Sequence, residues 1–161
     1  MPILTTCDPM KKPKVIDNNK ILLSTMQKGA MKGVKRVADA IVEEAKKKVP
    51  VDEGNLLRSI DAQQPKAVGK DGASCELGAY ADYALYVEYP TMPHDIVPKT
   101  REALRWEGEG GEVHFAHRVH HPGTDAQPFM RPAIDKLKAR GPLMIEEEIR
   151  LELKKTQELR T

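Results

Sequence analysis

The feature that most constrains the fold is a twelve-residue junction at residues 49–60, Val-Pro-Val-Asp-Glu-Gly-Asn-Leu-Leu-Arg-Ser-Ile. Pro50 cannot continue a helix, because proline lacks the amide proton and moves the preceding residue out of the helical region. Asp52 and Gly54 predict a turn, since an aspartate side chain accepts from nearby amides and glycine reaches backbone angles closed to other residues. The junction therefore predicts the end of a helix, then a turn, then an apolar strand that returns Leu56 to the core.

The segment before the junction has the pattern of a long amphipathic helix. From about Asn19 to Lys48, apolar residues recur at steps of three and four. Gly29 and Gly33 weaken the first half of this helix. The lysines of residues 46–48 fall in its last turn, where they complement the helix dipole, so we interpret them as a solvated helix end.

After the junction the pattern changes to short strands and helices. Ser59–Val68 and Ala73–Tyr80 predict a hairpin, because the Asp-Gly pair at residues 71–72 is a strong turn signal. The further predicted elements are a short helix at Asp82–Tyr89 capped by Asp82, extended segments at His94–Pro98 and Ala103–Glu107, a strand at Val113–His120 paired with Leu104–Trp106, and two helices at Gln127–Arg140 and Pro142–Leu159. We therefore expect an α+β fold in which a long N-terminal helix and C-terminal helices pack on a small, mostly antiparallel sheet.

Length and composition favour one domain with extensions. A chain of 161 residues can bury a real core. We divide it into an extended arm at residues 1–18, an α+β domain at 19–141 and a C-terminal helical extension at 142–161. The two cysteines, Cys7 and Cys75, indicate neither a disulfide framework nor a zinc site. No apolar run has the length of a signal peptide or a membrane span, so we expect synthesis in the cytoplasm.

Three segments carry recognisable motifs. They are the junction, residues 80–91 (Tyr-Ala-Asp-Tyr-Ala-Leu-Tyr-Val-Glu-Tyr-Pro-Thr) and residues 127–133 (Gln-Pro-Phe-Met-Arg-Pro-Ala). The last two are similar to the patterns Tyr-Ala-x-Tyr-Val-Glu-x-Gly-Thr and Pro-Phe-Leu-Arg-Pro-Ala, and with the junction they occur in the order found in the tail-component family of tailed bacteriophages. The chain resembles that family. It departs at Glu53, where a small hydroxylated residue is usual, and at Pro90, which replaces a glycine and changes the local turn.

The resemblance implies a structural protein of the virion and not an enzyme. It implies a neck, tail-completion or head–tail joining component that forms a cyclic homo-oligomer, expected to be a hexamer, around the DNA channel. The partners implied are a head connector, adaptor or head-closure protein on one side and a tail terminator or tail tube protein on the other. DNA would pass through the lumen without sequence-specific binding. A head-closure or connector ring is the alternative within this class, and no cofactor, metal or membrane is expected.

The motif residues are candidates for core or interface positions. Arg131 and Arg58 carry planar guanidinium groups suited to carboxylates, so Glu88 is a predicted partner in the same or the next subunit. Residues 2–18 and the last helix are expected to contact neighbouring subunits or rings. The candidate residues are Pro50, Asp52, Gly54, Leu56, Arg58, Ser59, Tyr80, Tyr83, Tyr86, Glu88, Pro128, Phe129, Arg131 and Pro132.

Two functions of other classes are kept as alternatives. A metal-dependent hydrolase would need His114, His117, His120 and His121 to converge, yet a strand sends His117 to the face opposite His114 and His120. A DNA-binding accessory protein would act through basic side chains, although 26 basic and 24 acidic residues give a net charge of only +2. Those side chains are Lys11, Lys12, Lys14, Lys20, Lys28, Lys32, Lys35 and Arg36.

Overall fold

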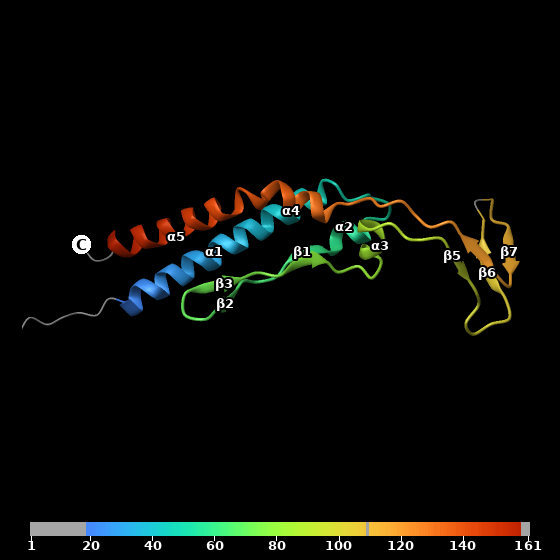
Figure 1. The fold of residues 1–161 in the computed structure, drawn as a ribbon, viewed down its shortest axis with the longest axis horizontal. Helices are drawn as coiled ribbons and strands as arrows, with labels where there is room; N and C mark the ends of the chain where they lie inside the picture. The colour runs from blue at the N-terminus through green and yellow to red at the C-terminus, as the bar shows by residue number, and fades with distance from the viewer. Residues whose placement is uncertain (1–18, 109, 159–161) are drawn as a thin grey trace, which may run out of the picture.

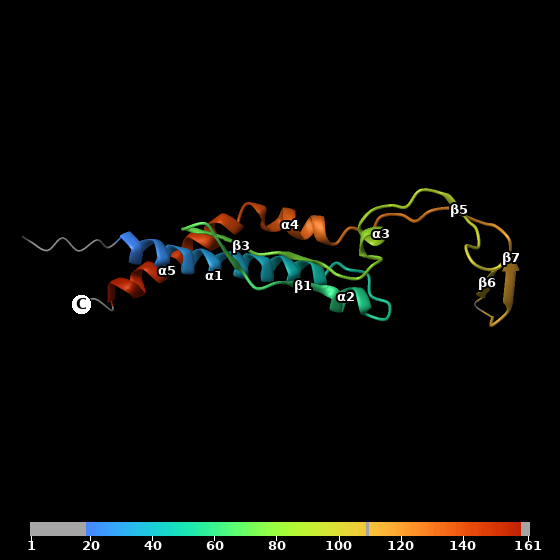
Figure 2. The same cartoon turned by 90° about the horizontal axis from the view of Figure 1, so that it is seen from below.

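The computed structural model describes residues 19–108 and 110–158. Figures 1 and 2 show an elongated molecule, with a body of helices and short strands at one end and a narrow arm of strands at the other. The predicted N-terminal arm of residues 1–18 lies outside the described residues. The α+β class, with a long first helix, C-terminal helices and small antiparallel sheets, is confirmed.

Helix α1, Asn19–Lys46, is the longest element of the body. Its buried face follows the predicted apolar pattern, and Ala38, Ile41, Val42 and Ala45 are all less than a tenth exposed. The helix ends two residues before the predicted end, and Val49 beyond it is also buried. The stripe therefore continues into the junction and ties the end of α1 to the core.

The junction contains a short helix that the sequence analysis did not predict. Helix α2, Asn55–Ser59, lies between the turn and strand β1, Ile60–Ala62, so the strand begins within one residue of its predicted start at Ser59. Gly54, and not Asp52, occupies the cap position of α2, where its φ of 76° is in the left-handed region that favours glycine. The turn nevertheless returns the chain to the core as predicted, since Leu56 is 4% exposed and Ile60 is fully buried.

The predicted hairpin is present as two successive two-stranded sheets. Strand β1 pairs antiparallel with β4, Leu77–Ala79, and β2, Lys66–Val68, pairs antiparallel with β3, Gly72–Ser74. Pro65 lies between β1 and β2 and cannot donate to a ladder, which is consistent with the interruption. The two sheets follow each other in one two-stranded ribbon, made of β1, β2, β3 and β4, and this ribbon lies along one side of α1 (Figure 1).

The arm consists of two further antiparallel pairs beyond helix α3, Ala84–Glu88. Strand β5, His94–Ile96, pairs with β8, Val119–His121, and β6, Leu104–Glu107, pairs with β7, Val113–Ala116. The pairing of β7 with residues 104–106 was predicted, but the single strand at 113–120 was wrong. The chain leaves its first partner after Ala116 and joins β5 from Val119 on, so the two halves belong to different sheets.

Two C-terminal helices complete the body. Helix α4, Met130–Lys138, and helix α5, Gly141–Glu158, are separated close to the predicted Gly141-Pro142 boundary. Helix α5 runs antiparallel along α1 (Figures 1 and 2). A Cβ atom at Gly29 would lie 2.5 Å from the Cα of Ile149, and one at Gly33 would lie 2.7 Å from the Cα of Ile145. The two glycines therefore allow the backbones to approach closely, a role that their low helix propensity alone does not indicate.

The first prediction concerns this helix contact. Gly33→Ala should destabilise the body by about 1–2 kcal/mol, because forcing the helices apart costs about 1–3 kcal/mol and the better helix propensity of alanine returns only part of it. Urea unfolding followed by circular dichroism measures the change. Gly78→Ala is the control, since a Cβ at Gly78 meets no atom within 4 Å. Equal stability of the two variants would contradict close packing at Gly33.

Candidate functional site

The residues of the second and third motifs meet at the start of helix α4. The Glu88 carboxylate accepts hydrogen bonds from the backbone amides of Phe129, Met130 and Arg131, at 2.8, 2.9 and 3.0 Å. These amides have no partner within the helix, and the helix dipole places partial positive charge there. Glu88, at the end of α3, therefore caps α4 from outside the helix although it is 41 residues away from Phe129 in sequence.

Arg131 closes the same site from its outer side. Its Nε donates to the Glu88 carboxylate at 3.1 Å, and its Nη2 donates to the Glu88 backbone carbonyl at 3.2 Å. Its guanidinium carbon lies 4.5 Å from the centre of the Tyr89 ring, within the range of a cation–π contact. The predicted pair of Arg131 and Glu88 thus occurs within one chain. We call this set of contacts the Glu88 clamp.

The environment of Glu88 favours its ionised form. Burial by itself raises the pKa of the carboxyl, but the donations from the amides of Met130, Arg131 and Phe129 and from the Arg131 side chain outweigh it. The pKa of Glu88 therefore lies below its ordinary value, and the residue is a structural anion. Phe129 beside it is 1% exposed and anchors α4, as predicted.

The other predicted pair is absent, and the junction motif has contacts of its own. The Arg58 guanidinium donates to Asn55 Oδ1 at 2.7 Å and to the Glu53 carbonyl at 3.2 Å, so it stabilises the α2 turn and not Glu88. Ser59 Oγ donates to the Leu56 carbonyl at 2.8 Å. A small cavity of about 290 Å³ brings the junction together with the second motif, and its lining includes Pro50, Asp52, Gly54, Leu56 and Tyr83.

The clamp also holds the base of the arm. The Gln127 amide donates to the Val87 carbonyl at 2.8 Å, and the Thr124 amide donates to Thr91 Oγ1 at 2.8 Å. At the crossing, Gly123 has a φ of 88°, and a Cβ there would lie 2.2 Å from the Thr91 carbonyl oxygen. The two chain segments that lead into and out of the arm are therefore fixed against each other beside the clamp.

The motif tyrosines lie on the surface of the chain and not in its core. Tyr80, Tyr83 and Tyr86 are 54%, 46% and 61% exposed, so the core alternative among the roles predicted for them is wrong. The hydroxyl of Tyr80 accepts from Gln63 Nε2 at 3.2 Å. Tyr86 lines an open pocket of about 780 Å³ at the base of the arm, which we call the Tyr86 pocket. Its other lining residues are Leu85, Tyr89, Pro90, Thr91, Met92, His94, Ile96, His121 and Thr124.

Sequence reasoning did not identify this pocket. Its residues come from α3, from the Pro90–Pro93 segment and from β5 and β8, which are distant in the sequence. Pro90, the departure from the family pattern, follows the extended C-cap Tyr89 and leads the chain out into the arm. The prolines at positions 90, 93 and 122 were the available signal, since they flank the segment that leaves the body.

The predicted histidine segment does not converge on one point. His114 stacks on Trp106, the His117 Nδ1 lies 2.7 Å from the Glu102 carbonyl, and His120 pairs with Asp95 at 2.9 Å. His121 stacks on His94 in the Tyr86 pocket. In the described part of the chain, no three His, Cys, Asp or Glu side chains are grouped so that they could hold a metal ion.

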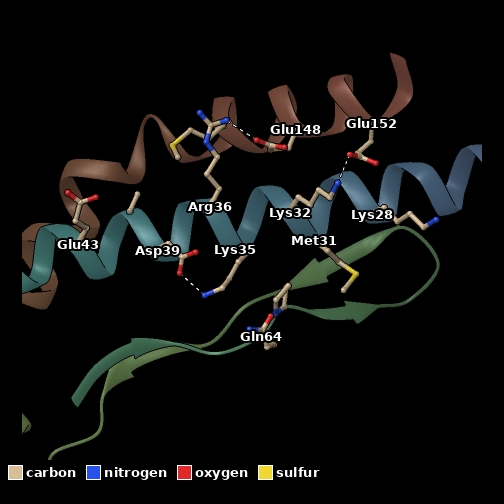
Figure 3. A pocket seen from close by; sticks show the side chains of 13 residues that line it. Lys28, Met31, Lys32, Lys35, Arg36, Asp39, Glu43, Gln64, Glu148 and Glu152 are labelled. Atoms are coloured by element: carbon tan, nitrogen blue, oxygen red, sulfur yellow. Dashed lines mark hydrogen bonds and ion pairs between the residues drawn. The ribbon is translucent and has the colours of Figure 1, made fainter. Parts of the chain in front are cut away.

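A second open cavity, of about 880 Å³, lies between α1, α5 and the ribbon (Figure 3). Met31, Ala40 and Met144 contribute apolar surface to it. Charged side chains on its rim pair with each other, and Figure 3 shows Lys32 with Glu152, Lys35 with Asp39 and Arg36 with Glu148. Lys32, Lys35 and Arg36, which were considered for DNA binding, are thus paired with acids of the same chain, whereas Lys11, Lys12 and Lys14 lie outside the described residues.

Residues 16–89 match the model of the family described as "Bacteriophage HK97-gp10, putative tail-component". The resemblance predicted from the sequence is confirmed over this segment, and the segment ends at the last residue before the arm. Comparisons with curated proteins and with solved structures gave no significant match. Among the described residues, no helix combines the length and apolarity needed to cross a membrane.

The second prediction concerns the charge of Glu88. Its folded-state pKa lies below the ordinary value of 4.5, so its contribution is complete above that pH and is lost as the pH falls through the folded value. The loss of stability between about pH 5 and pH 3 should therefore be steeper in the wild type than in Glu88→Gln. The variant should also be about 1–3 kcal/mol less stable at pH 7. Parallel pH profiles of the unfolding free energy would contradict the clamp.

The third prediction compares two arginine ion pairs. Arg131→Ala should cost about 1 kcal/mol, because it removes a charge-assisted bond to a buried carboxylate. Arg150→Ala removes an exposed pair with Glu146 on one helix and should change little. Thermal melts of the two variants under identical conditions measure the difference. Similar melting temperatures would show that Arg131 is dispensable to the clamp.

Proposed function

We propose that the protein is a structural component of the phage neck or tail that assembles into a closed ring, expected to be sixfold, around the DNA channel. The family match supports a tail component and therefore a place in the virion. The ring, the neck position and the absence of catalysis are the parts that we add. Within this class, tail completion is the role that we propose, and a head-closure ring is the alternative.

The observation that carries the ring is the large surface of the chain. The chain exposes 13032 Å². The 22 residues outside the description can contribute at most about 3,500 Å², and a compact body of the remaining mass would expose about 7,200 Å². The described residues thus expose roughly 2,000 Å² more than a compact monomer does.

That excess fits a subunit with two neighbours. A standard interface covers about 800 Å² on each partner, and a ring subunit has one interface on each side, which together cover about 1,600 Å². The exposed large side chains include Tyr80, Tyr83 and Tyr86 of the second motif and Met92, Trp106 and Phe115 of the arm. We assign these surfaces to contacts with identical subunits and with the virion proteins above and below the ring. On one side the partner would be a head connector, adaptor or head-closure protein, and on the other side a tail terminator or tail tube protein.

The rival functions have less support. The metal-dependent hydrolase needs a convergent histidine site, but the four histidines contact four different partners. The DNA-binding accessory protein needs free cations on α1, but Lys32, Lys35 and Arg36 are paired with carboxylates. DNA in this proposal passes through the opening without sequence-specific contacts.

The fourth prediction is the mass of the assembled protein. Light scattering and negative-stain imaging should give a closed ring, with about six times the 18.0 kDa of one chain, and a chelator should leave it unchanged. A protein that stays monomeric and also fails to assemble on isolated tails would contradict the proposal. A fold or mass that depends on the chelator would favour the metal-dependent alternative.

A further inference from the structure

We propose that the tip of the arm in one copy, the β6–β7 hairpin with Trp106 and Phe115, inserts into the Tyr86 pocket of the next copy. This inference rests on the proposed ring and deepens it, because it names the two surfaces that join neighbouring subunits. The proposed occupant of the pocket is a second copy of this chain.

The arm tip needs a covering partner. The register places Phe115 opposite Arg105 on one face of the hairpin and Trp106 opposite His114 on the other. Phe115 is 67% exposed and Trp106 is 43% exposed, so apolar rings stand on both faces. An isolated two-stranded hairpin is marginally stable in water, so packing against the surface of another molecule would stabilise the tip.

The Tyr86 pocket has the chemistry to receive these rings. Leu85, Tyr86 and Met92 in its lining are more than three-fifths exposed, which is unusual for large apolar side chains without a partner. His94 and His121 stack with ring centres 5.2 Å apart and add flat surfaces. Aromatic side chains pack well in such a site, where stacked or edge-to-face contacts add to the burial of area.

The tip cannot fill the pocket of its own chain. Figures 1 and 2 both place β6 and β7 at the far end of the arm and α3 at its base. The pocket is lined by residues of α3, by residues 89–92 and by β5, β8 and Thr124, and by none of β6 or β7. The hydrogen bonds between Thr91 and Thr124 and the close crossing at Gly123 fix the direction of the arm there. The two unpartnered apolar surfaces therefore meet only between copies.

The geometry of this contact agrees with the proposed ring. Tip and pocket are different patches, so each subunit offers its tip to one neighbour and its pocket to the other, and repetition closes a ring when the rotation allows it. The surface excess of roughly 2,000 Å² is enough for both contacts, which need about 800 Å² each.

Trp106 provides a direct test, because it is the only tryptophan of the chain. In the full-length protein its emission should shift to shorter wavelength, and its quenching by acrylamide should fall about twofold or more, as the concentration rises through the assembly range. Tyr86→Ser should weaken assembly about tenfold or more and remove the shift. Val68→Ser is the matched control, since Val68 is similarly exposed but lies outside the pocket, and circular dichroism checks that both variants fold.

A cross-linking experiment identifies the partner. Arg105→Cys, opposite Phe115 on the same face of the tip, and Ile96→Cys, in the lining of the pocket, are made separately, each with Cys7→Ser and Cys75→Ser, so that Phe115 and Tyr86 themselves are kept. With a short bismaleimide, a covalent dimer should form when the two variants are mixed and not when Arg105→Cys is mixed with Val68→Cys in the same background.

The outcomes separate the inference from the proposed function. Rings that form without the Trp106 shift and without the cross-link between positions 105 and 96 would overturn the inference, leave the ring intact and assign the pocket to another virion protein. A protein that remains monomeric at every concentration would overturn the inference as well. The ring itself is then judged by assembly on isolated tails.

Discussion

The structure depends on one buried carboxylate at the start of a helix. Glu88 belongs to α3, but its carboxylate oxygens accept hydrogen bonds from the first amides of α4. The backbone amide and the side chain of Arg131 both donate to this carboxylate. An isolated helix of nine residues is marginal in water, so α4 needs this external cap and the buried Phe129 to persist. Beside this contact, the Gln127 amide donates to the Val87 carbonyl, so the segments that enter and leave the arm are joined next to the clamp. One anion therefore links α3 to the last helices at the point where the arm begins.

The α1–α5 pair shows how the body stays narrow and still stable. Gly29 and Gly33 bring the backbones together, and the charges along the seam are complementary, with Lys32 and Arg36 on α1 facing Glu152, Glu147 and Glu148 on α5. Exposed pairs of this kind contribute little stability each, but they disfavour other registers of the two helices. The C-terminal helix, which the sequence analysis expected to contact neighbouring subunits or rings, packs on α1 within its own chain. Among the described residues, Tyr80, Tyr83 and Tyr86 and the arm present large exposed apolar side chains.

The sequence was informative where local pattern determines structure. Periodicity located α1, α4 and α5, the Asp-Gly turn located the β2–β3 pair, and two motifs correctly suggested that Glu88 meets Arg131. It failed where tertiary contacts decide. Residues 55–59 form a helix because Gly54 adopts the left-handed conformation and its carbonyl accepts a hydrogen bond from the backbone amide of Arg58. The partner switch between β7 and β8 and the pocket at the arm base join residues far apart in the chain, and one sequence holds no signal for such pairings.

The crossing of Thr91 and Thr124 has a consequence for how such a chain can diversify. Because the two ends of the intervening segment already lie side by side, changing its length costs little closure entropy, about 0.6 kcal/mol for each doubling. The family match also stops at residue 89, immediately before that segment begins. The length of the arm can therefore change at little cost in free energy to the helices and the clamp that support it.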